Sequence, residues 1–308
     1  MISYLAKFFD KVLCKKNIET LEGWVVQLAI TGMIVHLALH FINQIFFKSE
    51  FFSEVLGHNL LSSIYTPFSF VLFFEVFLMV VAIPESFSKS IGIQFQIMAL
   101  IVVRSALKEI GSIRDISQFS ENSTIYINMA LDLTVGLFLY FLIGCFEHLM
   151  VSKSTSLKLN PKPAPHVGTY SVKINRFIKV KKAVSIALTI FLLVLAFVSL
   201  GRWVLEILHV SSLPGMSQLS NVNSVFYLDY FSLLIFVDVF LVLYSLKENT
   251  SFQFVFRNVG FVVSTIIMRF YFVSPRPYNL ALVVLGVLFG TITLAISRFY
   301  QRLDSLNV

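Results

Sequence analysis

The stretch Phe68–Leu78, FSFVLFFEVFL, recurs later in the chain as Phe231–Leu241, FSLLIFVDVFL. Six of the eleven positions are identical, and Glu75 in the first copy corresponds to Asp238 in the second. Each copy is too apolar for a surface helix, yet each has one carboxylate in its middle. The recurrence indicates an internal repeat that brings an acidic residue into two apolar helices.

Each copy is followed by a short polar turn and a second apolar run that contains an arginine, Arg104 or Arg269. We expect two antiparallel helical hairpins, with the carboxylate and the arginine at similar depth counted from the turn. A charge in hydrocarbon costs about 2.5–3.5 kcal/mol. We therefore expect Glu75 to form an ion pair with Arg104, and Asp238 with Arg269, so that the opposite charges neutralise each other. These four residues are the main candidates for a functional site.

The composition predicts an all-α integral membrane protein. The 308 residues are 57% hydrophobic and only 13% charged, with 33 Phe and a mean hydropathy of +0.82, whereas soluble domains are about 25% charged. Crossing a bilayer takes about 20 helical residues. Eight runs are of this kind: Trp24–Phe46, Thr66–Ile83, Ile91–Leu107, Ile125–His148, Ala183–Leu208, Val225–Leu246, Phe252–Val273 and Leu280–Ser297.

The formal charge of +7 comes from lysines and arginines in the N-terminal tail, the centre and the C-terminal end. Because successive spans cross the membrane in opposite directions, these three basic regions all lie on one side. Basic residues concentrate on the cytoplasmic side of membrane proteins, so both termini are predicted to be cytoplasmic. This placement argues against nucleic acid as a partner. The predicted units are a basic N-terminal segment (1–22), a four-helix repeat (23–150), a basic linker (151–182) and a second four-helix repeat (183–308). The two repeats should have the same orientation in the membrane.

The predicted partner is the lipid bilayer. Lys179, Lys181 and Lys182 stand just before a span, where they could contact anionic headgroups at about 1 kcal/mol per charge. The rest of the linker, rich in Pro and Lys, is expected to be solvated. The N-terminal segment fits either an interfacial amphipathic helix or a solvated tail. A homo-oligomer is compatible with the sequence, which does not decide between one copy and several.

Metal and cofactor binding are not predicted. His36 and His40 share one helical face, but no Cys, Asp or Glu cluster supplies further ligands, so interhelical hydrogen bonding is the preferred interpretation. Cys14 and Cys145 are expected to be free thiols.

Four other charged residues are secondary candidates. Asp132 either joins the Glu75–Arg104 cluster or lies at the water boundary, and we favour the boundary. Arg202 and Glu206, four residues apart, are expected to pair at the outer interface. Arg257 follows a turn and is expected to extend towards the cytoplasmic headgroups. A rigid external turn is predicted at Pro275–Pro277.

The segment Val225–Gln301 resembles the phosphate-starvation-inducible PsiE family of small bacterial inner-membrane proteins. The family unit resembles a four-span bundle with an acidic residue in its second span and two arginines in its third, matched here by Asp238, Arg257 and Arg269. In the first half Glu75 and Arg104 match, but Gly92 replaces the first arginine. The resemblance implies a bacterial inner membrane and a role in phosphate starvation or envelope stress, without a defined biochemical activity.

An enzyme is not predicted, because the chain contains no HExxH, GxSxG or Walker motif. Two classes remain. In one, the charge pairs are structural staples in a membrane-stress component. In the other, they form a pathway for an ion or a small anion. Their matched occurrence in both halves favours staples, and neither class identifies a substrate.

Overall fold

The structure is a computed structural model that describes residues 2–47, 56, 60–112, 123–157, 167–210, 222–246 and 251–306. All regular secondary structure in these residues is helical. Among the described residues, eight helices are long and apolar enough to cross a membrane, one for each of the predicted spans. The prediction of an all-α multi-pass membrane protein is therefore confirmed.

The described helices form two groups of four, preceded by the short helix α1 (Ile2–Val12). The first group is α2 (Lys15–Ile42, continued by the π-helical η1, Asn43–Phe47), α4 (Tyr65–Ala82, preceded by the 3-10 turn η2, Leu60–Ile64), α5 (Phe87–Ser112) and α6 (Ser123–Leu157). The second group is α7 (Val167–Val210), α8 (Val222–Leu246), α9 (Phe252–Arg269, continued by the 3-10 turn η3, Phe270–Phe272) and α10 (Tyr278–Leu306).

Local sequence explains the turn between α4 and α5. Pro84 has no backbone N–H for a continuing helix, and α4 ends at Ala82. Ser86 then caps α5, because its Oγ accepts a hydrogen bond from the Lys89 N–H at 3.2 Å. Glu85 and Lys89 form an exposed ion pair at this turn. The turn therefore marks a water boundary of the bundle.

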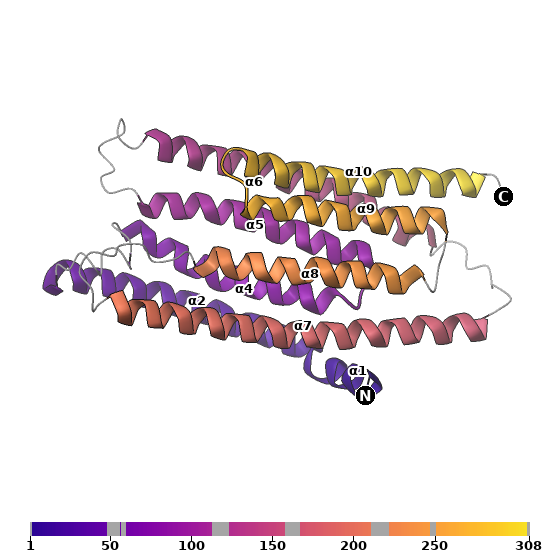
Figure 1. Cartoon of the computed structure of the whole chain (residues 1–308), viewed down its shortest axis with the longest axis horizontal. Coiled ribbons are helices and arrows are strands. Elements are labelled where there is room, and N and C mark those ends of the chain that lie inside the picture. The colour runs from indigo at the N-terminus through magenta and orange to yellow at the C-terminus, as the bar shows by residue number, and fades with distance from the viewer. Residues whose placement is uncertain are drawn as a thin grey trace.

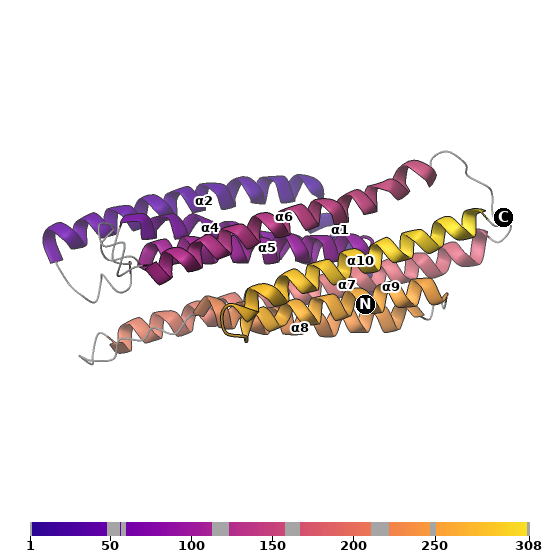
Figure 2. The ribbon, with the colours of Figure 1, turned by 90° about the horizontal axis from the view of Figure 1, so that it is seen from above.

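The helices pack as two layers, each made of one group. Within each layer, helices that follow one another in sequence are neighbours. Between the layers, α4 contacts α7, α5 contacts α9, and α6 contacts α10. Figure 2 shows the first layer lying over the second. Short connections make sequential neighbours the expected arrangement, but the pairing between layers is information that only the structure supplies.

Aromatic side chains fill the space between the layers. The rings of Phe95 on α5 and Phe146 on α6 have centroids 5.0 Å apart, and Phe146 in turn meets Phe261 on α9 at 5.9 Å. All three side chains are fully buried. Edge-to-face contacts of this kind contribute beyond the burial of apolar area. Large apolar residues such as Leu137, Phe197 and Phe236 point outward instead, as a lipid-facing surface requires.

The N-terminal segment forms helix α1, which packs against α7. Ala6 and Phe9 are buried, and Asp10 pairs with Lys182 at 2.5 Å. The first residues are thus a helix docked on the protein, and the solvated tail that the sequence left open is not what the structure contains.

Helical structure covers most of the segment that we predicted to be a linker, residues 151–182. Helix α6 continues to Leu157 and α7 already begins at Val167, so only residues 158–166 lie outside the described residues. The three prolines of the segment, Pro161, Pro163 and Pro165, all fall in that short stretch. From Val167 onward no proline interrupts the helix, so α7 runs through the boundary at residue 182, which stays a prediction.

Candidate functional site between the two layers

A polar contact joins the two layers deep inside the bundle. Gln94 Nε2 on α5 donates a hydrogen bond of 2.9 Å to Asp238 Oδ2 on α8. Asp238 is 1% exposed and Gln94 is fully buried. Gln94 Oε1 has no hydrogen-bond donor among the residues that the structure describes. Tyr230, eight residues before Asp238 on α8, is also fully buried. Asp238 and Gln94 thus form a small polar site inside the bundle.

A second polar contact joins the layers at the end where α9 meets α10. Arg276, in the turn before α10, donates hydrogen bonds of 2.8 Å to Asp132 Oδ2 on α6 and to Ser105 Oγ on α5. Its other terminal nitrogen lies 3.3 Å from Glu109 Oε1. Asp132 is fully buried, while the Arg276 side chain is about a quarter exposed. We call this group the Arg276 clasp, because one loop of the second layer binds two helices of the first.

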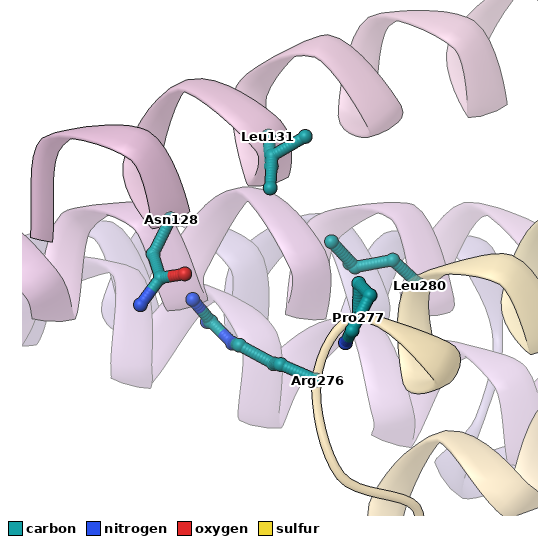
Figure 3. A pocket seen from close by; sticks show the side chains of 5 residues that line it. All are labelled: Asn128, Leu131, Arg276, Pro277 and Leu280. Atoms are coloured by element: carbon teal, nitrogen blue, oxygen red, sulfur yellow. The ribbon is translucent and has the colours of Figure 1, made fainter. Parts of the chain in front are cut away.

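A small pocket of about 220 Å³ lies beside the clasp, lined by Asn128, Leu131, Arg276, Pro277 and Leu280. Figure 3 shows the Arg276 side chain extending from the turn towards α6, next to Asn128. The predicted rigid turn at Pro275–Pro277 therefore carries the residue that connects the layers.

Further contacts connect the layers at the opposite end. Lys181 on α7 donates to the Glu85 carbonyl at 2.7 Å, and Ser185 donates to the Val80 carbonyl at 2.6 Å. Arg298 on α10 donates to the Met150 carbonyl at 2.9 Å. The buried Asp238–Gln94 contact thus lies between two sets of polar ties, one at each end of the bundle.

The charge pairs that we predicted within each hairpin do not form among the described residues. Gln94, from the other layer, contacts Asp238, while Arg104 donates to Ser69 Oγ at 2.9 Å. The prediction assumed that Glu75 and Arg104 lie at the same depth along their two helices, and they do not. Glu75 lies nine residues before Pro84 and Arg104 lies twenty after it, a difference of about 16 Å along antiparallel helices.

The four main candidates therefore have four different environments. Asp238 faces the other layer, Arg104 is buried against α4, and Glu75 lines a groove on the outer side of the first layer. Arg269 ends α9, and its Nε is buried without a hydrogen-bond acceptor among the described residues. The repeat identified equivalent positions in sequence that the fold does not make equivalent in space.

His36 connects α2 to its neighbours, as the preferred interpretation expected. Its Nδ1 lies 2.6 Å from Thr66 Oγ1, and its Nε2 lies 2.8 Å from the Leu56 carbonyl. The Nδ1 of His40 is buried and without a hydrogen-bond partner among the described residues. Across the described ranges, no three His, Cys, Asp or Glu side chains gather as metal ligands, and Cys14 and Cys145 are free thiols.

The secondary candidates fall in different places. Asp132 is buried in the Arg276 clasp, at the end of the bundle where α9 meets α10. Arg202 is exposed, and the side chain of Glu206 lies outside the described residues. Arg257 is half-buried over the Phe254 ring, 5.4 Å from its centroid.

The lysines that we assigned to lipid contact divide into two kinds. Lys181 is 5% exposed and Lys182 pairs with Asp10, so both bind protein groups. Only Lys179 has an exposed side chain. Successive residues of a helix point about 100° apart, and three neighbouring lysines therefore cannot all face the lipid.

The fold and its apolar helices define a multi-pass membrane protein. No protein-family model, curated protein or solved structure matches the chain. The resemblance to the PsiE family stays a prediction from the sequence.

Sequence reasoning did not find Gln94, Ser69 or the role of Arg276. Gln94 is a neutral residue in an apolar run, 144 residues from its partner Asp238. Its only signal in the sequence is an uncharged polar side chain within a membrane span. For Arg276, the signal was its position between two prolines in a short loop.

Proposed function

We propose that the protein moves protons, alone or together with a solute, across the membrane, and that Asp238 takes up and releases the proton. The observation that carries this proposal is the contact of a fully buried carboxylate with a neutral glutamine across the boundary between two helical layers. Ionisable residues inside membrane bundles commonly belong to ion pathways.

The chemistry of the partner supports a proton rather than a fixed ion pair. An arginine can only donate hydrogen bonds, so it favours the ionised carboxylate. Glutamine has both a donor and an acceptor. Its Nε2 binds ionised Asp238, and its Oε1, which has no donor among the described residues, can accept the O–H of protonated Asp238. The site can therefore hold both protonation states of Asp238.

The position of the site between two sets of polar ties supports the same proposal. The Arg276 clasp closes one end of the layer boundary, and the Lys181 and Arg298 contacts close the other. Opening one set while the other stays closed would connect Asp238 to one side of the membrane at a time.

The orientation of the chain belongs to the proposal. We place it in a bacterial inner membrane, with two like-oriented four-helix repeats and both termini in the cytoplasm. The distribution of Lys and Arg supports this orientation. Helix α1 and the last turn of α10 lie towards the same end of the bundle (Figure 1).

A second candidate is a non-catalytic membrane component that responds to phosphate starvation or envelope stress. The polar ties at both ends of the layer boundary favour it, since they hold the two layers together. In this case Asp238–Gln94 is one more structural contact, and the protein transports nothing.

Proton flux in liposomes separates the two candidates. We expect the reconstituted protein to acidify or alkalinise the lumen when a potassium gradient with valinomycin imposes a voltage. Asp238→Asn should reduce this flux to the level of protein-free liposomes, because asparagine retains the hydrogen bond from Gln94 but cannot release a proton. The readout is a pH-sensitive dye trapped in the lumen.

Asp229→Asn is the matched control, since Asp229 lies on the same helix but is exposed. It should leave the flux unchanged. Equal flux in the wild type and Asp238→Asn would overturn the role of Asp238, and no flux in the wild type at any voltage would favour the second candidate.

A further inference from the structure

A groove of about 980 Å³ opens on the outer side of the first layer, away from the layer boundary. It is formed mainly by α5 and α6, with Glu75 contributed by α4. Its volume lies at the upper end of the range typical of small-molecule sites, about 300–1,000 Å³. Tyr140 and Phe141 line it and are 77% and 63% exposed. The groove therefore opens laterally, where lipid surrounds the helices.

The groove contains two carboxylates and lacks strong cations. Glu75 and Glu147 are half-buried in its wall, and Glu147 Oε1 accepts a hydrogen bond of 2.5 Å from Gln96. None of the described lining residues is a lysine or an arginine, and His148 alone among them could carry positive charge. No described cation forms an ion pair with either carboxylate.

These carboxylates lie well below the membrane surface. Gln96, which contacts Glu147, comes nine residues after the start of α5 at Phe87, and nine residues of helix span about 14 Å. The exposed Glu85–Lys89 pair marks the water boundary just before that start. A hydrocarbon core is about 30 Å thick, so the carboxylates lie near its middle.

We infer that the groove is a binding site for a lipophilic organic cation. Keeping two ionised carboxylates next to hydrocarbon costs free energy. A bound cation would offset this cost by pairing with their negative charge. The aromatic rings of Tyr140 and Phe141 would also attract a cation. The depth excludes the amine headgroup of a membrane lipid, which stays near the surface. The occupant is a free molecule with delocalised or shielded positive charge and an apolar body.

Tetraphenylphosphonium is a direct probe, and tetraphenylborate is a control of nearly the same size with the opposite charge. We expect the purified protein in nanodiscs to bind radiolabelled tetraphenylphosphonium saturably, at one site per chain. Tetraphenylborate should show only the non-saturable partitioning seen with empty nanodiscs. The double variant Glu75→Gln/Glu147→Gln should bind tetraphenylphosphonium about tenfold more weakly or worse, because its charge attraction is removed.

Two further variants keep the test independent of folding. Gly144 lines the groove, and a Cβ added there would meet no heavy atom within 4 Å. Gly144→Phe should therefore fold normally, fill the groove and abolish binding. Glu85→Gln removes an exposed carboxylate at the nearby turn and should bind as the wild type does.

Equal binding of the two probes, or unchanged binding of tetraphenylphosphonium in the double variant, would overturn the inference. Either result would indicate a groove filled by lipid chains or by a second copy. This test does not depend on proton flux, so its outcome is separate from that of the proposed function.

Discussion

Arg276→Gln is expected to lower the free energy of unfolding by about 3 kcal/mol or more. Asp132 is fully buried, and Arg276 is the cation that binds it. Removing one member of a buried ion pair leaves an uncompensated charge, which typically costs about 3–5 kcal/mol. One arginine also binds Ser105 and approaches Glu109, so a single substitution detaches the α9–α10 turn from two helices. Unfolding in mixed detergent–dodecyl sulfate micelles, followed by circular dichroism, measures the effect.

A double-mutant cycle identifies the cause. Asp132→Asn combined with Arg276→Gln should be much less destabilised than the sum of the single changes, since no unpaired charge remains. Arg276→Lys should be intermediate, because lysine keeps the charge but loses the planar fork. Additive effects in the cycle, or a loss below about 1 kcal/mol for Arg276→Gln, would contradict the clasp.

Gly286→Leu is expected to be comparably damaging, because α9 and α10 touch at this glycine. A Cβ at position 286 would lie 2.4 Å from Met268 Cγ and 3.1 Å from both the Met268 nitrogen and the Ser264 carbonyl oxygen. Two of these atoms belong to the backbone and cannot rotate away. Ser264 Oγ also donates a hydrogen bond of 2.7 Å to the Gly286 carbonyl. Overpacking costs about 1–3 kcal/mol and sometimes more, and we expect the upper end here.

Gly144→Leu is the matched control for this substitution. Position 144 is also a glycine inside a helix, but nothing lies within 4 Å of an added Cβ. Replacing glycine by leucine favours the helix by about 1 kcal/mol at either position. At position 144 this gain should not be offset by a steric clash. Melting temperatures in detergent should fall for Gly286→Leu and stay level or rise for Gly144→Leu. Equal temperatures for the two variants would show that the contact between α9 and α10 is not tight.

The membrane helices were predictable because hydrocarbon imposes a simple rule on sequence. A segment that crosses it must be helical and mostly apolar over its length. Even the short run Ile91–Leu107 met this rule, and the structure contains it as the span Phe87–Glu109. The ends of α6 and α7 were less predictable, since polar residues do not stop a helix where no proline intervenes.

The polar site was harder to predict because its partners are far apart in sequence. We assigned Asp238 to the nearest arginine in its own hairpin, and the fold gives it Gln94 from the other layer. Glu75 occupies the equivalent position in the repeat but faces outward. The packing of the two layers decides which side of a helix faces a partner. No short sequence pattern predicts that packing.

Asp132 illustrates the same limit. Its position near the outer end of a span is typical of a residue at the water boundary, and we favoured that interpretation. In the fold it is buried beneath the α9–α10 turn, where it binds Arg276, 144 residues away in sequence. Both the buried acid and the loop arginine were visible in the sequence, but their contact was not.

The central claim is that Asp238 exchanges a proton while it is buried between the layers, and infrared difference spectroscopy tests it most directly. We expect a lowering of pH to produce a carboxylic acid C=O band that shifts in deuterated water. Among the acid bands that appear at low pH, one should be present in the wild type and in Asp229→Asn, and missing in Asp238→Asn. If the spectra of the wild type and Asp238→Asn are identical at every pH, Asp238 does not exchange a proton and the account is contradicted.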